Sequence, residues 1–308
     1  MNKKVLLTGA NGLLGQKLIQ LIQDNPDYKL IATGRGENRN PETEKGKYTY
    51  ISLDITNREA VLDTLRTLKP DFIIHTAAMT NVDQCEQEKE GCWKNNVEAV
   101  EHLVEAAEEN RAFLIHLSTD FIFDGIAGPY KEEASPNPIS YYGESKLEAE
   151  RVVKAAKTKW AIVRTVLVYG LAHDMSRSNI ILWVKNSLEA AKNIQVVNDQ
   201  WRTPTLAEDL ALGCFLIMQT QSEGIFNISG KELLSPYQMA IMTADFFDLN
   251  KALITESDGS KFTQVAKRPP RTGFIIEKAE SVLGFKPHSF QEGIEILSKQ
   301  LGKIQRQA

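Results

Sequence analysis

Short apolar runs alternate with helical patterns along the first half of the chain. We expect these runs to be buried β-strands, because their side chains are apolar on both faces. In order they are Val5–Leu7, Leu30–Thr33, Phe72–His75, Leu114–Ser118 and Ala161–Val168. Between them, apolar residues recur every three or four positions, as in amphipathic helices. The alternation predicts a doubly wound α/β fold, in which helices cover both faces of a parallel sheet of the Rossmann type.

The pattern changes after about residue 170, where longer helical stretches dominate. Ser235 suits the N-cap of one of these helices, with Pro236 at its first position. The polar segment 258–271 ends in Arg-Pro-Pro-Arg and is expected to be a loop. The other elements predicted here are a strand at Gly224–Ser229 and helices at Ile180–Ala191, Ala207–Gln219 and Phe290–Leu301.

Composition excludes several classes of protein. Of the 308 residues, 42% are hydrophobic and 25% are charged, as in an ordinary globular protein. The formal net charge of −4 disfavours nucleic-acid binding, which needs clustered positive charge. The three cysteines are too few and scattered for a disulfide framework or a metal site, so reduced thiols in a cytoplasmic protein are expected. The five histidines form no metal-binding pattern, and no apolar window is long enough to span a membrane.

A glycine-rich loop follows the first strand and opens the first helix. In such a loop the first glycine permits a tight turn, the second lets the backbone approach a pyrophosphate, and the third lets the helix pack on the strand. The helix N-terminus then offers free N–H groups to the phosphates. We prefer dinucleotide binding to an ordinary glycine-rich turn, because a strand precedes the loop and a helix follows it. The residues predicted to hold the cofactor here are Gly9, Asn11, Gly12, Leu13, Leu14 and Gly15.

Further cofactor contacts are predicted at the ends of the next strands. Arg35 follows the second strand, where an arginine accommodates the 2′-phosphate of NADPH and an acidic residue would bind the ribose of NADH. A solvated surface arginine is the alternative. Asp54 and Ile55 lie at another strand end, where the aspartate either caps a turn or contacts the adenine. Ala77 and Ala78 leave room for the cofactor to pass.

The chain is thus expected to divide into two parts. Residues 1–170 form the NAD(P)-binding Rossmann domain, with a returning segment at about 203–230. Residues 171–308 form mainly a smaller, interleaved α/β substrate-binding lobe.

Tyr142 and Lys146 are the candidate catalytic pair. They are four residues apart and share one face of a predicted helix. A tyrosine with a pKa near 10 is a poor acid at neutral pH, and a neighbouring ammonium group lowers that pKa. Thr119 and Asp120 close a strand at the sheet edge where ligands bind. Thr119 is a candidate to hydrogen-bond a substrate carbonyl, although backbone capping explains it equally well in isolation.

These motifs resemble the extended short-chain dehydrogenase/reductase superfamily, and within it the dTDP-4-dehydrorhamnose reductase family. The resemblance runs from residue 5 to about residue 275. Its other segments are Thr76–Asp83, Ser118–Gly125, the block from Asn198 to Ala211, and Arg268-Pro269. It implies NADPH-dependent reduction of the 4-keto group of a nucleotide-linked deoxysugar, most closely dTDP-4-dehydro-L-rhamnose to dTDP-L-rhamnose. NADH is the alternative cofactor.

The resemblance also implies roles for individual residues. Tyr142 would donate a proton to the carbonyl, Lys146 would lower the pKa of Tyr142 and bind the nicotinamide ribose, and Thr119 would orient the carbonyl. Asp120 would bind the substrate, and Arg202 and Arg268 are candidates for its pyrophosphate. Mg²⁺ is suggested by the resemblance only, since no dedicated ligand set is present. A homodimer is the expected assembly.

Several positions depart from the family pattern, and two other functions are weighed. Phe121 replaces a usual tyrosine, Leu167 a common tryptophan, Arg202 a glycine, and Arg271 an asparagine; these changes leave the sugar open. A non-catalytic NADP-binding subunit, like the regulatory subunit of methionine adenosyltransferase, resembles the same reductases, but this chain keeps the Tyr–Lys pair. Another sugar-nucleotide reductase or epimerase is the second alternative. A 4,6-dehydratase would need a carboxylate pair beside the threonine, which Phe121 interrupts.

Overall fold

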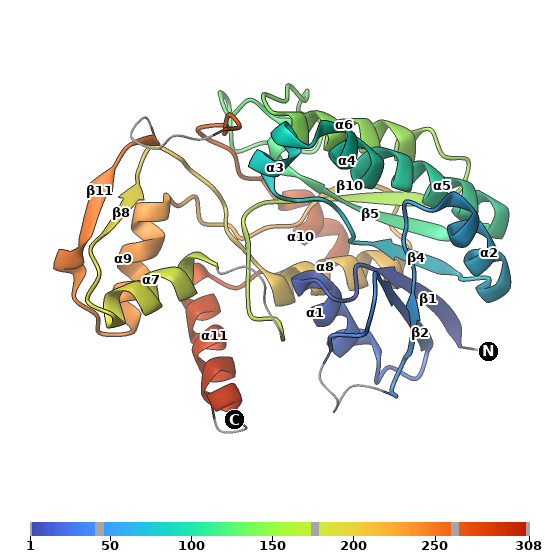
Figure 1. Ribbon diagram of the computed structural model, residues 1–308, viewed down its shortest axis with the longest axis horizontal. Coiled ribbons are helices and arrows are strands. Elements are labelled where there is room, and N and C mark those ends of the chain that lie inside the picture. The colour runs from blue at the N-terminus through green and yellow to red at the C-terminus, as the bar shows by residue number, and fades with distance from the viewer. Residues whose placement is uncertain (1, 41–45, 174–178, 260–264, 306–308) are drawn as a thin grey trace.

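A seven-stranded parallel sheet forms the larger part of the computed structural model, which describes residues 2–40, 46–173, 179–259 and 265–305 (Figure 1). The strand order is β10-β6-β5-β4-β1-β2-β3. This order confirms the predicted Rossmann-type fold, and it reverses between β1 and β4. Ligands of such sheets bind at this switch point, outside the carboxyl ends of the strands. The strands are β1 (Lys3–Thr8), β2 (Tyr28–Gly34), β3 (Thr49–Ser52), β4 (Phe72–His75), β5 (Phe113–Thr119), β6 (Trp160–Thr165) and β10 (Gly224–Asn227).

Helices cover both faces of this sheet (Figure 1). On one face α1 (Leu13–Ile22) packs against α8 (Ala207–Thr220), with α10 (Glu277–Leu283) beside α8. On the other face lie α2 (Arg58–Leu68), α5 (Ala99–Asn110) and α6 (Tyr141–Lys154). Each layer buries its own apolar cluster against the sheet, which accounts for strands that are apolar on both sides. Both α8 and β10 come from the returning segment at about 203–230.

A second lobe lies beside the sheet domain, at the left of Figure 1. Its elements are α7 (Ile180–Glu189), β8 (Ile194–Val197), α9 (Pro236–Phe246), β11 (Ile254–Ser257) and α11 (Phe290–Gln305). β8 and β11 pair in parallel, and α7 and α9 pack on each other. The predicted start of α9 is confirmed, because Ser235 and Gln238 form a reciprocal capping box with Pro236 in the first turn.

Short elements complete the described chain. Between β4 and α5 lie α3 (Val82–Gln87), α4 (Lys89–Trp93) and a π-helical turn (Lys94–Glu98). Single 3₁₀ turns follow β5 at Asp120–Ile122 and precede β11 at Lys251–Leu253. Over residues 265–271 of the predicted loop 258–271 there is no helix or strand, and residues 260–264 lie outside the described part. None of the helices described has the length and apolar character needed to cross a lipid bilayer.

One predicted strand is wrong in its extent. The run Ala161–Val168 is not continuous, because β6 ends at Thr165 and β7 (Val168–Tyr169) pairs instead with β9 (Thr205–Leu206). Leu167, between them, has a φ of 41° and turns the chain out of the main sheet. The pattern of apolar residues cannot reveal such a change of partner strand, because β6 and β7 are both largely apolar.

Candidate active site

Two adjoining cavities lie at the carboxyl edge of the sheet, where the strand order reverses. The first has a volume of about 420 Å³ and is lined by the glycine loop and the ends of β2 and β4. The second has a volume of about 510 Å³ and is lined by the ends of β5 and β6, the start of α6, and by Arg202 and Leu210. Both cavities are bordered by Leu13, Leu14, Thr76, Ala78 and Thr80, so they form one continuous site.

The glycine loop is built for close approach. Gly9 has a φ of 76°, and a Cβ there would lie 2.8 Å from the backbone nitrogen of Ala77. A Cβ on Gly15 would lie 2.8 Å from the Cα of Ala10. Gly12 meets only one neighbouring atom within 4 Å, and α1 begins after it without a side-chain cap or an acidic residue in its first turn. The exposed N–H groups and open backbone therefore fit a pyrophosphate.

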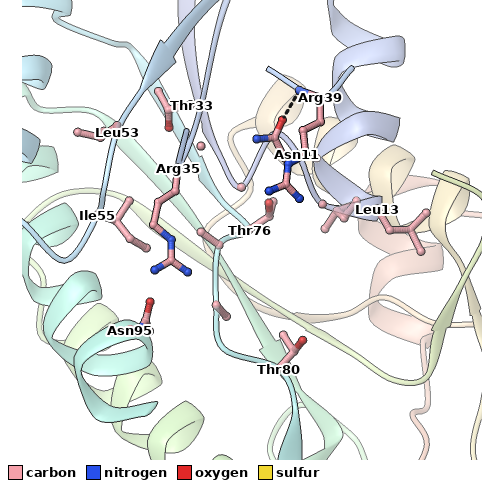
Figure 2. Close-up of a pocket in the computed structure, with 17 residues that line it drawn as sticks. Asn11, Leu13, Thr33, Arg35, Arg39, Leu53, Ile55, Thr76, Thr80 and Asn95 are labelled. Carbon is pink, nitrogen blue, oxygen red and sulfur yellow. Dashed lines mark hydrogen bonds between the residues drawn. The ribbon is translucent and has the colours of Figure 1, made fainter. Parts of the chain in front are cut away.

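Arg35 and a second arginine border the outer end of the first cavity. Figure 2 shows Arg35 and Arg39 directing their guanidinium groups into it from different sides. The Asn11 side chain accepts a hydrogen bond from the Arg39 backbone at 3.0 Å and donates to the Glu37 carbonyl, so it orders the loop that carries Arg39. Sequence reasoning missed Arg39, whose signal was a second arginine four residues after Arg35.

The other predicted cofactor residues fall into two groups. Ile55, Ala77 and Ala78 line the first cavity, beside Leu53 and Asn95. Asp54 does not line it; its carboxylate accepts hydrogen bonds from the backbone and hydroxyl of Thr56. Of the two roles considered for Asp54, the structure therefore shows the turn cap.

The second cavity brings Thr119, Tyr142 and Lys146 together. All three are buried and line this cavity, and the neighbouring Thr119 side chain acts to lower the pKa of Tyr142. The Ser140 side chain caps the N-terminus of α6, two residues before Tyr142. Sequence reasoning also missed Gly143, where a Cβ would collide with the carbonyl oxygen of Phe121. This glycine lets α6 approach the turn after β5, which sets Tyr142 beside Thr119.

Burial dominates the electrostatics of the Tyr–Lys pair. It lowers the pKa of Lys146 to about 8, because the charged form loses solvation. It also raises the pKa of Tyr142, against the opposing influence of the neighbouring Thr119. The expected lowering of the Tyr142 pKa by Lys146 is thus not found in the protein alone. Lys146 Nζ instead donates to the Leu117 carbonyl at 2.7 Å and lies 3.3 Å from His116 Nε2.

Asp120 and Arg202 form an internal network at the cavity wall. Asp120 accepts hydrogen bonds from Thr119 and Thr272, and Arg202 Nε lies 3.6 Å from its carboxylate. Arg202 also donates to the backbone carbonyls of Trp201 and Pro269, both at 2.7 Å. Burial raises the pKa of Asp120, and Arg202 counteracts this. Both residues line the cavity, but their polar atoms are largely engaged within the protein.

Arg268 lies outside the lining of both cavities described here. Its guanidinium group makes a two-pronged ion pair with Asp83 of α3, with N–O distances of 3.1 and 2.8 Å. The same guanidinium donates to the Ala266 carbonyl. The Arg268 guanidinium group, which we expected to bind a substrate pyrophosphate, thus binds the Asp83 carboxylate instead.

The positions that depart from the family pattern differ in their placement. Phe121 lies edge-on to the Tyr142 ring, with 5.7 Å between centroids, and lines the second cavity with Leu167. Arg271 stacks over Trp201 and donates to the Gly128 carbonyl, away from the lining. Within the described residues, no group of three or more histidines, cysteines and acids is arranged to hold a metal ion, and Mg²⁺ has no support.

Fold and site together define the class of protein. The Rossmann-type sheet, the glycine loop and the Tyr–Lys pair beside a strand-end threonine are those of an extended short-chain dehydrogenase/reductase, an oxidoreductase that uses a nicotinamide cofactor. Within this class the chain belongs to the family described as RmlD substrate binding domain, whose pattern matches residues 3–302.

Two kinds of protein share about a third of their aligned residues with this chain. The dTDP-4-dehydrorhamnose reductase of Aggregatibacter actinomycetemcomitans is 32% identical over 310 residues, covering 95% of this chain and 97% of the relative. Methionine adenosyltransferase 2 subunit beta of Danio rerio is 33% identical over 292 residues, covering 93% and 87%. The crystal structure of dTDP-4-dehydrorhamnose reductase from Bacillus anthracis in complex with NADP has a TM-score of 0.83 at 28% identity, covering 97% of this chain and 100% of the other. In sequence and structure the chain is close to dTDP-4-dehydrorhamnose reductase, an NADPH-dependent oxidoreductase, and the homology supports a sugar-nucleotide reductase.

Proposed function

We propose that this protein reduces the 4-keto group of a nucleotide-linked deoxysugar with NADPH, and that its substrate is dTDP-4-dehydro-L-rhamnose. The observation that carries the proposal is the convergence of Thr119, Tyr142 and Lys146 on a cavity continuous with the glycine loop. The reductase relatives from A. actinomycetemcomitans and B. anthracis support the choice of sugar.

The first cavity would hold the cofactor. The backbone of Gly9–Gly15 and the N-terminus of α1 would bind its pyrophosphate, and Arg35 and Arg39 would bind the 2′-phosphate that distinguishes NADPH from NADH. When bound, the cofactor supplies the hydride for the carbonyl carbon. The two arginines favour NADPH as the preferred cofactor.

The reaction also needs a proton, which the chain itself would provide. The raised pKa keeps the Tyr142 phenol protonated, so its Oη holds a proton for the carbonyl oxygen while the carbon accepts the hydride, and the ketone becomes an alcohol. Thr119 Oγ1, which lines the same cavity, would orient the carbonyl. The Lys146 ammonium would stabilise the phenolate as it forms.

The test is oxidation of NADPH in the presence of the keto sugar, with NADH in parallel. Tyr142→Phe removes the proton donor and should lower kcat by about 10²–10⁴-fold. Tyr141→Phe is the matched control, because it deletes the neighbouring hydroxyl on the same helix, and it should retain turnover. Equal activity of Tyr142→Phe and the wild-type protein would overturn the proposed mechanism.

A regulatory subunit is the second candidate, favoured by the 33% identity with the D. rerio relative. Such a protein would bind NADPH without oxidising it in the presence of any keto sugar tested. It would also change the activity of a methionine adenosyltransferase mixed with it. The intact Thr119, Tyr142 and Lys146 favour the reductase.

A further inference from the structure

Two buried histidines lie side by side next to Lys146. His75 of β4 and His116 of β5 are register partners in the sheet, and their rings stack with 5.3 Å between centroids. Both side chains are almost fully inaccessible to solvent. His75 Nδ1 lies 2.7 Å from the Thr8 hydroxyl, whereas His116 Nε2 faces the Lys146 ammonium.

The contact with Lys146 determines which tautomer of His116 is present. A lysine ammonium only donates hydrogen bonds, so His116 Nε2 must be the acceptor and the ring proton must sit on Nδ1. Burial and the nearby Lys146 charge keep the pKa of His116 well below its ordinary value, and burial lowers the pKa of His75 to about 3. Both rings are therefore neutral at physiological pH.

This arrangement leaves one buried polar atom without a partner. His116 Nδ1 has no hydrogen-bond partner among the described residues. An unpaired buried donor costs free energy, and its retention beside a reaction centre calls for an explanation. The explanation lies at the other ring nitrogen, which contacts Lys146.

The hydrogens of Lys146 Nζ can be assigned one by one. An ammonium group has three. One is directed to the Leu117 carbonyl at 2.7 Å and a second to His116 Nε2 at 3.3 Å. The described residues supply no further hydrogen-bond partner, and Lys146 lines the second cavity, so the third hydrogen is left for that cavity.

We propose that His116 is a positioning residue, which orients the Lys146 ammonium through Nε2 so that one N–H faces the cavity beside Tyr142. The proposal rests on the proposed function, because that function gives Lys146 its task. A neutral acceptor fixes the direction of the ammonium without the strong charge pairing that a carboxylate would impose. His116 itself does not touch the reacting groups.

Other titratable groups near Lys146 do not replace this contact. The titratable groups near it are His116 from β5, His75 from β4, Cys92 from α4, Glu150 from α6, and Tyr142 of α6, which lines the same cavity. Glu150, one turn along the helix, is paired with buried Arg164 at 2.8 Å. Loss of the His116 acceptor should therefore lower the Lys146 pKa further, because the charged form loses a hydrogen bond.

The test measures NADPH affinity by fluorescence over a pH range of about 6 to 10. Lys146 would bind the cofactor ribose, so the wild-type affinity should fall with a midpoint near pH 8, where Lys146 loses its charge. Lys146→Met should abolish this midpoint. His116→Leu should move it down by about one pH unit. His116→Gln, which keeps an acceptor, should restore it.

His75→Leu is the matched control, because it removes an equally buried ring from the same stack whose Nδ1 contacts the Thr8 hydroxyl, while the hydrogen bond of Lys146 is to His116. It should leave the midpoint unchanged. An unshifted midpoint in folded His116→Leu, or an equal shift in His75→Leu, would overturn the proposal, as would survival of the midpoint in Lys146→Met. The assay needs no sugar, so failure of the proposed reductase function would show separately, as absent turnover.

Discussion

Leu167 carries backbone strain that no local element explains. Six described non-glycine residues have a positive φ, and five of them follow helix C-termini, where the left-handed conformation is common. Leu167 instead lies between β6 and β7 in the lining of the second cavity, with 40% of its surface exposed. Strain of this kind concentrates at functional sites. The side chain therefore forms part of the wall of the cavity that we propose to hold the substrate.

Replacing Leu167 with glycine should separate stability from function. Glycine adopts a positive φ without strain, so Leu167→Gly should raise the free energy of unfolding by about 0.5–1 kcal/mol in urea titrations. The same change should raise the KM for the keto sugar, because it removes an apolar wall. Gln221→Gly relieves similar strain at the end of α8, and should stabilise without changing KM. A lower stability of Leu167→Gly would contradict this account.

At the scale of elements, the site depends on how closely α6 approaches the turn after β5. The nearest atom to a Cβ on Gly143, apart from the Phe121 backbone, is a Pro138 carbon at 3.0 Å. Neither neighbour has room to move, since one is backbone and the other is a rigid ring. The close approach of Tyr142 to Thr119 thus depends on glycine, which has no side chain, at position 143.

Gly143→Ala should therefore damage both fold and activity. Alanine normally stabilises a helix relative to glycine, but here we expect a loss of about 1–3 kcal/mol in unfolding free energy from overpacking. Displacement of Tyr142 should lower kcat about 10²-fold. Gly91→Ala, on α4, is the control: its Cβ would meet nothing closer than 3.9 Å, so thermal unfolding and turnover should be preserved. Wild-type turnover in Gly143→Ala would refute the packing argument.

Local patterns predicted the elements well and their tertiary partners poorly. Tyr142 and Lys146 could be proposed because helical spacing puts them on one face and the glycine loop precedes them in the chain, whereas the spacing by itself says little. Arg202 and Arg268 were expected at a pyrophosphate, but their guanidinium groups contact Asp120 and Asp83; the latter is 185 residues from Arg268. Nothing in the sequence distinguished His116 from an ordinary histidine of the core. Such contacts arise from the fold, and one sequence does not display them.

For the whole molecule, Asp83 and Arg268 join the two parts of the chain. Asp83 belongs to α3 beside the sheet, and Arg268 follows the second lobe's last strand. The pair also fixes the Ala266 backbone, whose N–H donates to Asp83. The segment 265–271 is thereby held against the sheet domain next to the second cavity, where Pro269 and Pro270 accept hydrogen bonds from Arg202.

This link should make stability depend on pH in a defined direction. The hydrogen bond from Arg268 lowers the pKa of Asp83 below its ordinary 3.8. A lowered carboxyl pKa stabilises the native state above the unfolded value, and this contribution is lost as the pH falls through the folded value. Asp83→Asn should therefore reduce the free energy of unfolding at pH 7 by about 0.5–1 kcal/mol, a modest figure because the pair is partly exposed.

Urea unfolding of the wild-type protein and Asp83→Asn at a series of pH values checks this prediction. The difference between the two should be constant near neutral pH and shrink below about pH 4, as Asp83 of the wild-type protein becomes protonated. Asp63→Asn is the matched control, because Asp63 pairs with Arg66 on the exposed face of α2 and should contribute little. If the two variants lose the same stability, or if the difference persists in acid, then Asp83 and Arg268 do not couple the second lobe to the sheet.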